Sequence, residues 1–262
     1  MGLATSVLRL IAQRHRERPW SGPVMTLGVQ DVAATYDDLR RLLREERCPY
    51  VDVPAAERTT TTSRYLLASG GHRFVHARVF FRMLGLEGYD DMDFVETERP
   101  TRIHDLNEPI PSEWRGRYGL VVDGGTVEHV FDVRSALANA IALLGVGGDV
   151  LHVSPLSGWV NHGFYQLNPC LYFDFYGANG FDVLSADLVR LPREPGRHDE
   201  RIEPYRHVED LVDLADEQLY RTLLVFRARK AKESPLRLPV QGCYRKYTMW
   251  HRCGEPAVSA AG

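Results

Sequence analysis

The fold is decided by the stretch from Tyr118 to Pro155, which reads YGLVVDGGTVEHVFDVRSALANAIALLGVGGDVLHVSP. Leu120-Val121-Val122 is a short apolar run, typical of a strand that is buried on both faces. Arg134 to Leu144 carries apolar residues at helical spacing, and we expect Gly147-Gly148 to close that helix. Val150 to Val153 then starts another strand. This order is half of a doubly wound α/β sheet, and such sheets bind ligands beyond the carboxyl ends of their strands.

The same alternation extends along the rest of the chain. It predicts a Rossmann-like, mostly parallel sheet of seven strands with helices on both faces. We expect helices at residues 3–16, 36–46, 74–84 and 134–144, and strands at residues 24–27, 89–96, 103–106, 120–122, 150–153, 181–189 and 219–228.

Three segments stand outside this pattern. Residues 47–71 are interpreted as an insertion after the first strand–helix unit, either a flexible cover or an arm for a homodimer. Residues 193–207 are charged and are expected to lie in solvent. Residues 1–230 would then form one domain, with residues 231–262 as a C-terminal extension.

The composition excludes several classes of protein. The 262 residues are 44% hydrophobic, enough for a sizeable core, and their formal net charge of −3 offers no electrostatic footprint for nucleic acid or a membrane surface. No apolar run approaches the roughly 20 residues that cross a bilayer, and the N-terminus lacks the pattern of a secretory signal. The four cysteines form no CxxC pair, so a cytoplasmic protein with free thiols is expected.

Four motifs together resemble the class I S-adenosylmethionine (SAM)-dependent methyltransferases, in particular a bacterial subgroup from glycan and natural-product clusters. The motifs are HDLNEPIP (104–111), LVVDGGTVEHVFDV (120–133), LLGVGGDVLHVSP (143–155) and NHGFYQLNPCLYFDFYGANGF (161–181). The resemblance covers about a third of the chain. It implies a SAM cofactor, S-adenosylhomocysteine as product, and methyl transfer to oxygen or nitrogen of a small molecule such as a sugar or specialised metabolite.

The resemblance also implies a set of cofactor contacts. The methionine part of SAM would lie over Leu27-Gly28, and Glu96, or failing that Asp93, would hold the ribose hydroxyls. Asp105-Leu106 would lie at the adenine. The first loop departs from the family's pattern, because it has one glycine and its acid lies far beyond the usual spacing of about 20 residues.

The second motif of the resemblance, at residues 120–133, lies nearest the chemistry. Asp123-Gly124-Gly125 would face the reactive sulfur, where a carboxylate complements the sulfonium charge and glycines leave room for the ligand. Glu128 and His129 would then start the next helix, with Glu128 favourable at its N-terminus.

The aromatic segment after residue 158 is interpreted as the wall of the acceptor pocket. Methyl transfer depends on alignment and on exclusion of water, and a hydroxyl or amine acceptor must lose a proton. A histidine suits that role, so His162 is the first candidate base and His129 the second. The pocket would be shaped by Trp159, Asn161, Phe164, Tyr165 and Gln166.

Other chemistries have less support. Cys243, His251 and Cys253 lack metal-ligand spacing, so no metal is expected. One alternative keeps the fold but transfers the aminocarboxypropyl arm of SAM or uses its sulfonium charge in a different reaction. The other alternative is a non-catalytic binding or scaffold module on the same fold.

Overall fold

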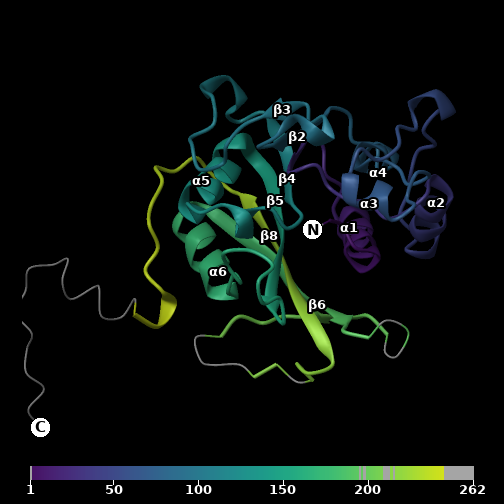
Figure 1. The fold of residues 1–262 in the computed structure, drawn as a ribbon. Helices are drawn as coiled ribbons and strands as arrows, with labels where there is room; N and C mark the ends of the chain where they lie inside the picture. Colours follow the sequence, from purple (N-terminus) through teal and green to yellow (C-terminus); the bar gives the residue numbers. More distant parts are fainter. Residues whose placement is uncertain (1, 195, 197–198, 209–212, 215, 245–262) are drawn as a thin grey trace, which may run out of the picture.

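The protein is described here by a computed structural model, which covers residues 2–194, 196, 199–208, 213–214 and 216–244 (Figure 1). Its centre is a sheet in the order β3-β2-β1-β4-β5-β8-β6-β7. The strands are β1 (Val24–Leu27), β2 (Tyr89–Asp93), β3 (Arg102–Ile103), β4 (Tyr118–Asp123), β5 (Leu144–Ser157), β6 (Phe181–Pro192), β7 (Arg201–Pro204) and β8 (Tyr220–Lys230).

Helices lie on both faces of this sheet. The α-helices are α1 (Thr5–Glu17), α2 (Tyr36–Glu45), α3 (Arg64–Ala68), α4 (Ala77–Met83), α5 (Val133–Leu143) and α6 (Pro169–Ala178). Short 3-10 helices are η1 (Ala55–Glu57), η2 (Glu96–Glu98), η3 (Ser112–Trp114), η4 (Val127–His129) and η5 (Gly242–Tyr244). In Figure 1, α1 to α4 lie on one side of the sheet, and α5 and α6 lie on the other.

The strand directions confirm the predicted mostly parallel sheet. β1 pairs in parallel with β2 and β4, and β4 pairs in parallel with β5. β8 then runs antiparallel between β5 and β6. The carboxyl ends of β1, β2, β4 and β5 therefore meet at one edge of the sheet, where a ligand site is expected.

The sheet has one strand more than the sequence predicted. β7 pairs antiparallel with β6, with Leu188 opposite Glu203, inside the stretch that was expected to lie in solvent. Charged side chains are compatible with this position because β7 is an edge strand, and such strands keep polar groups in water.

The predicted helix end at Gly147-Gly148 is also wrong. α5 ends at Leu143, and β5 begins at Leu144 without an intervening turn. The glycines instead lie in an irregularity of the β4–β5 pair, where the register shifts between Tyr118 and Leu120. Gly147 has a φ of 88°, which favours glycine.

Two hydrophobic clusters bury the two faces of the sheet. In β4, Leu120 and Val122 face the cluster that contains α1, α2 and α4, whereas Val121 faces the cluster that contains α5 and α6. All three side chains are at most 1% exposed. Burial on both faces is what the continuous apolar run of this strand predicted.

The segment at residues 47–71 is attached to the end of the sheet. Thr60 forms a bridge with Val75, and the amide of Thr61 donates to the carbonyl of Phe74. The amide of Arg64 donates to Glu98 at 2.9 Å, which ties α3 to the turn after β2. These contacts hold the segment beside the carboxyl ends of β1 and β2.

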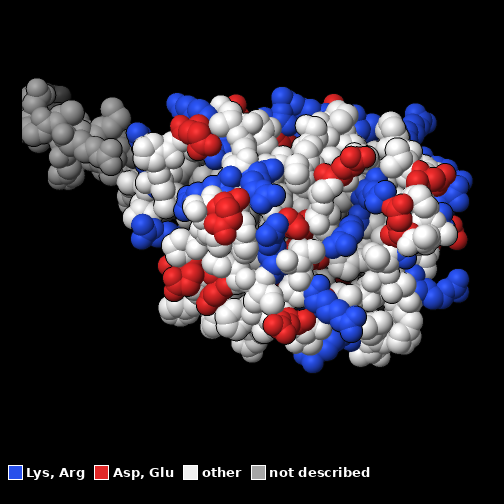
Figure 2. All heavy atoms as spheres, turned by 90° about the horizontal axis from the view of Figure 1, so that it is seen from above, with Lys and Arg blue, Asp and Glu red and all other residues white. Residues whose placement is uncertain are grey.

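The surface carries charges of both signs. In Figure 2, Lys and Arg side chains alternate with Asp and Glu over the visible face. None of the helices in the part of the chain that the structure describes combines the length and apolar character needed to span a membrane.

Candidate functional site

Three adjoining cavities lie at the carboxyl edge of the sheet. Cavity A, of about 350 Å³, is lined by residues that include Met92, Asp93, Phe94, His104, Asp105, Leu106 and His129. Cavity B, of about 270 Å³, is lined by residues that include Gly28, Asp31, Ser63, Tyr65, Asp93, Gly125 and His129. Cavity C, of about 540 Å³, is lined by residues that include Leu3, Asp31, Tyr65, Trp159, His162 and Leu223. Cavities A and B share Asp93, Thr126 and His129 in their walls, and cavities B and C share Asp31 and Tyr65, so the three adjoin one another.

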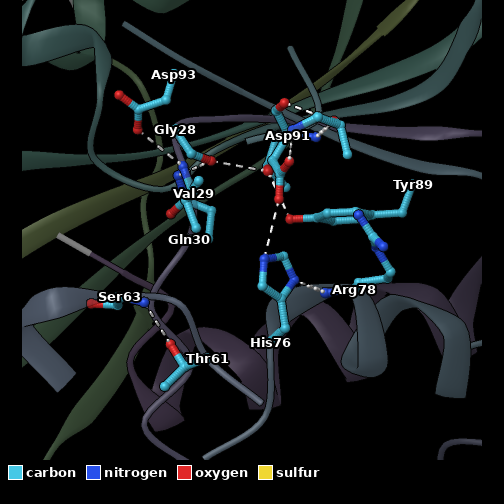
Figure 3. Close-up of polar contacts among 12 residues, drawn as sticks. Gly28, Val29, Gln30, Thr61, Ser63, His76, Arg78, Tyr89, Asp91 and Asp93 are labelled. Carbon is cyan, nitrogen blue, oxygen red and sulfur yellow. Dashed lines mark hydrogen bonds and ion pairs between the residues drawn. The ribbon is translucent and has the colours of Figure 1, made fainter. Parts of the chain in front are cut away.

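Gly28 lines cavity B at the end of β1, next to Val29 and Gln30 (Figure 3). Its φ is 82°, and a Cβ atom there would lie 2.5 Å from Thr126 Oγ1. The amide of Gly28 donates to the carbonyl of Met92 at 2.6 Å, and its carbonyl accepts from Thr26 Oγ1 at 3.0 Å. Thr126 leaves no space for a side chain at residue 28. Because glycine has none, the backbone itself can line the cavity here.

A buried polar cluster fixes the strand ends beneath that loop (Figure 3). Asp91 is 1% exposed, and its Oδ2 lies 3.2 Å from His76 Nε2. The amide of Thr101 donates to Asp91 Oδ1 at 2.7 Å. Burial acts to raise the pKa of Asp91, but these hydrogen bonds hold that pKa below its usual value. The cluster ties β2 to the segment that precedes α4.

The structure separates the two candidate acids after β2. Asp93 lines both cavity A and cavity B, and its Oδ2 accepts weakly from the Val29 amide at 3.4 Å. Glu96 is exposed in η2 and lines none of the three cavities. Asp93 thus has the position that the sequence assigned first to Glu96.

Asp105 and Leu106 lie together in the wall of cavity A. Leu106 is 6% exposed, whereas Asp105 is half-buried and accepts from the backbone and side-chain nitrogens of Asn107 at 2.9 and 2.7 Å. The backbone contact is the larger cause of the lowered pKa of Asp105. An apolar wall with a carboxylate at its rim suits a heteroaromatic ring that carries an amino group.

Asp123 lies beneath the cavities. Its side chain is 0% exposed and lines none of the three. Asp123 Oδ1 accepts from the amides of Thr126 and Val127 at 2.8 and 3.2 Å, and Oδ2 lies 2.7 Å from His152 Nδ1. The carboxylate is therefore occupied in shaping the loop after β4, and the geometry does not bring it to a ligand.

The two glycines of that loop, Gly124 and Gly125, differ in whether they reach a cavity. A Cβ atom on Gly124 would collide with the Gln30 side chain, so this position is closed by packing. Gly125 has a φ of 94° and lines cavity B. Of the predicted triplet after β4, Gly125 alone reaches a cavity.

A second buried network behind Asp123 was missed in the sequence. His152 Nε2 lies 2.6 Å from the Tyr176 hydroxyl, and Ser154 Oγ lies 2.5 Å from the Tyr172 hydroxyl. Burial raises the pKa values of both tyrosines well above the usual value. The alternation of His152 and Ser154 with Leu151 and Val153 in β5 was a signal for polar residues on one buried face.

Replacing Asp123 with alanine should lower the free energy of unfolding by about 2–4 kcal/mol, because two amides and His152 lose a buried partner. Denaturant unfolding measures this change. Asp132→Ala is the matched control, since exposed Asp132 caps α5 through the Ser135 amide and its loss should cost only about 1 kcal/mol. An Asp123 variant as stable as the parent chain would contradict this structural role.

Glu128, His129 and His162 form a cluster where the cavities meet. Glu128 is 0% exposed, and its Oε1 lies 3.9 Å from His129 Nε2 and 3.6 Å from His162 Nε2. The two imidazole rings are 4.9 Å apart between centroids, in an edge-on arrangement. Burial, followed by the charge of Asp123, raises the pKa of Glu128 to about 8.

The local backbone explains how this cluster forms. Glu128 and His129 belong to η4, and α5 begins only at Val133, so the prediction that they start the helix is wrong. The carbonyl of Glu128 accepts from the amides of Phe164 and Tyr165. A Cβ atom on Gly163 would lie 2.8 Å from that carbonyl oxygen. Gly163 thus allows the turn carrying His162 to approach η4 closely.

Of the predicted acceptor wall, Trp159 and His162 reach cavity C. The Trp159 and His162 rings have centroids 5.3 Å apart. The Tyr165 hydroxyl donates to the carbonyl of Phe131, and Gln166 Oε1 accepts weakly from the Trp159 amide at 3.4 Å. Asn161 has a φ of 62° and Phe164 is 65% exposed, and neither lines a cavity described here.

The segment at residues 47–71 contributes lining residues that sequence reasoning missed. Ser63 lines cavity B, Leu66 lines cavity C, and Tyr65 lines both. The Tyr65 side chain remains 74% exposed. No pattern in the sequence assigned these residues to a site, because their position depends on pairing with residues 74–76.

The sequence matches none of the known protein-family models and none of the curated proteins. Solved structures that resemble the fold include a SAM-dependent methyltransferase from Thermotoga maritima, a possible histamine N-methyltransferase. It is 12% identical, with 85% of this chain and 89% of that chain covered at a TM-score of 0.40.

Two further structures resemble the fold. A putative methyltransferase from Bacillus halodurans C-125 is 12% identical, with 88% of this chain and 100% of that chain covered at a TM-score of 0.45. The 1,6-didemethyltoxoflavin-N1-methyltransferase of Burkholderia thailandensis, bound to 1,6-didemethyltoxoflavin and S-adenosylhomocysteine, is 17% identical, with coverages of 87% and 78% and a TM-score of 0.41.

The sheet order, the antiparallel β8 and the helices on both faces define the fold class. It is the Rossmann-like, mostly parallel α/β fold that the sequence predicted, with β7 added at the edge.

Proposed function

We propose that the protein transfers a methyl group from SAM to an oxygen or nitrogen atom of a small molecule, such as a sugar or specialised metabolite. The observation that carries this proposal is the pair of adjoining cavities A and B at the ends of β1, β2 and β4, with Asp93 lining both. Cavity C adjoins cavity B through Asp31 and Tyr65 and is large enough for a small acceptor.

The residues present fit SAM. Cavity A offers Leu106 and Met92 to the faces of an adenine ring and Asp105 to its amino group. Asp93, between cavities A and B, is placed to accept both ribose hydroxyls. Gly28 and Gly125 expose backbone in cavity B, where the methionine part would lie.

The chain's own residues would then position the acceptor. SAM supplies an electrophilic methyl group, so that the acceptor's lone pair forms the new bond to carbon while the carbon–sulfur bond breaks and its electron pair stays on sulfur. Trp159 and Tyr65 confine the acceptor in cavity C and reduce its contact with water. His162 lines the same cavity, with His129 beside it, and is placed to take the acceptor's proton.

Residues 47–71 act in this proposal as a cover over cavities B and C. The alternative, an arm for a homodimer, predicts that the chain elutes as a dimer and that deletion of α3 makes it monomeric. A cover predicts instead that Tyr65→Ala weakens acceptor binding without changing the oligomeric state.

Incubation with SAM and a panel of hydroxyl and amine acceptors tests the reaction. S-adenosylhomocysteine and a methylated acceptor are the expected products. Conversion of an acceptor with methylthioadenosine in place of S-adenosylhomocysteine would favour transfer of the aminocarboxypropyl arm. A folded chain that binds no SAM in calorimetry would favour the scaffold alternative.

Replacing Asp93 with asparagine should raise the Kd for SAM about 10- to 100-fold, because a charge-assisted contact to the ribose contributes about 1.5–3 kcal/mol. Titration calorimetry measures the change. Glu96→Gln is the matched control and should leave the Kd unchanged, since Glu96 lines none of the three cavities. A raised Kd for Glu96→Gln together with an unchanged Kd for Asp93→Asn would instead assign the ribose contact to Glu96.

A further inference from the structure

Glu128 is a buried carboxylate that lacks a hydrogen-bond partner in the described part of the chain. The residue is 0% exposed, and neither carboxylate oxygen has a hydrogen-bond partner among the described residues. His162 Nε2 is likewise buried without a hydrogen-bond partner. Buried polar groups are nearly always satisfied, so two such groups facing each other indicate that something else occupies the space between them.

The separations are those of ligand atoms around one ion. Glu128 Oε1 lies 3.6 and 3.9 Å from the two imidazole nitrogens, too far for hydrogen bonds. One donor atom from each of Glu128, His129 and His162 lies within 4.8 Å of the other two. Around a tetrahedral ion with bonds of about 2.1 Å, neighbouring donor atoms lie about 3.4 Å apart. Small side-chain rotations would close this difference.

The ligand types also suit a metal ion. Two imidazoles with one carboxylate favour first-row transition ions over Mg²⁺ and Ca²⁺, which prefer oxygen ligands throughout.

We propose that Glu128, His129 and His162 bind one divalent transition-metal ion, of the zinc or iron(II) type, at the junction of cavities B and C. Three protein ligands leave at least one coordination position open. His162 lines cavity C and His129 lines cavity B, so the open position faces the space between the cofactor and the acceptor.

This position suggests the class of acceptor, a step that rests on the proposed function. A small molecule with a hydroxyl oxygen would coordinate the ion, which lowers the hydroxyl pKa. The proton leaves to water, the oxygen lone pair forms the bond to the methyl carbon, and the carbon–sulfur bond breaks with its electron pair on sulfur. His162 then acts on the acceptor through the ion, and oxygen is favoured over nitrogen as the methylated atom.

Titration of the untagged, metal-free chain with cobalt(II) tests metal binding without any activity assay. One equivalent should bind, with the visible absorption of a four- or five-coordinate site of nitrogen and oxygen ligands. Glu128→Gln and His162→Gln should each weaken binding by at least about 100-fold. His72→Ala, an exposed histidine outside the three cavities, is the matched control and should bind as the parent does.

The possible outcomes distinguish failure of the proposed metal site from failure of the proposed methyl transfer. Thiolate absorption, or equal binding by the parent and both variants, would overturn the metal site. Should Glu128→Gln fail to fold by circular dichroism, His162→Gln decides, because that side chain is one-quarter exposed. Cobalt binding without SAM binding would refute the proposed function alone. Methyl transfer that persists in chelator, without cobalt binding, would refute the metal site alone.

Discussion

Replacing His162 with alanine should lower the turnover number for methyl transfer by about 10²- to 10⁴-fold and leave the Kd for SAM unchanged. The reason is its place in the site. His162 lines cavity C, whereas the proposed SAM contacts lie in cavities A and B. Loss of the imidazole removes the group that activates the acceptor, either directly or through a bound ion. Steady-state kinetics and calorimetry measure the two quantities.

The matched control for this prediction is His72→Ala, which should retain the parent's turnover because that exposed histidine lies outside the cavities. Circular dichroism verifies that both variants fold. A His162 variant with full turnover would remove this residue from the reaction. A variant with raised SAM Kd and unchanged turnover would instead assign His162 to the cofactor.

Much of the fold could be predicted because it depends on local patterns. Leu120, Val121 and Val122 form a continuous apolar run, which predicts a strand buried on both faces, and their side chains do divide between the two hydrophobic clusters. The errors occur where pairing overrides local preference. Gly147-Gly148 looks like a helix end, yet pairing with β4 extends β5 back to Leu144. β7 is charged and forms only because β6 offers an unpaired edge.

The site was predictable in outline and less so in its particular residues. Gly28, Asp93, Asp105 and Gly125 line cavities because strand ends in a parallel sheet meet at one edge. Glu96 was preferred over Asp93 because a strand boundary cannot be fixed to within three residues by periodicity. Asp123 has the expected position, but its partner His152 lies on another strand, and no sequence pattern shows that contact.

The cluster of Glu128, His129 and His162 shows most clearly what could not be predicted from the sequence. Metal ligands are recognised in sequence by short, regular spacing, and His162 is too far from His129 to form such a pattern. The two histidines meet because amides of residues 164 and 165 bond to the Glu128 carbonyl across two loops. No pattern in the sequence indicated a metal, and the proposed site rests on the three-dimensional arrangement of these residues alone.

Replacing Asp149 with asparagine should lower the free energy of unfolding by about 3–5 kcal/mol, the largest stability effect expected here. Asp149 is 0% exposed and accepts from Trp20 Nε1 at 2.7 Å, Arg227 Nε at 2.8 Å and Arg229 Nε at 2.6 Å. Without the carboxylate, the Arg227 guanidinium would remain buried and uncompensated. Equilibrium unfolding in urea measures the loss, and Glu45→Gln, at an exposed ion pair with Arg9, should cost less than about 1 kcal/mol.

A second substitution separates loss of the charge pair from loss of packing. Arg227→Met in the Asp149→Asn background removes the uncompensated charge and keeps an apolar chain of similar length, so the double variant should regain part of the lost stability. Burial lowers the pKa of Arg227, whereas the charge of Asp149 and its hydrogen bond act to raise it. A double variant less stable than Asp149→Asn alone would mean that the Arg227 side chain stabilises β8 by packing over Trp20, rather than by its charge.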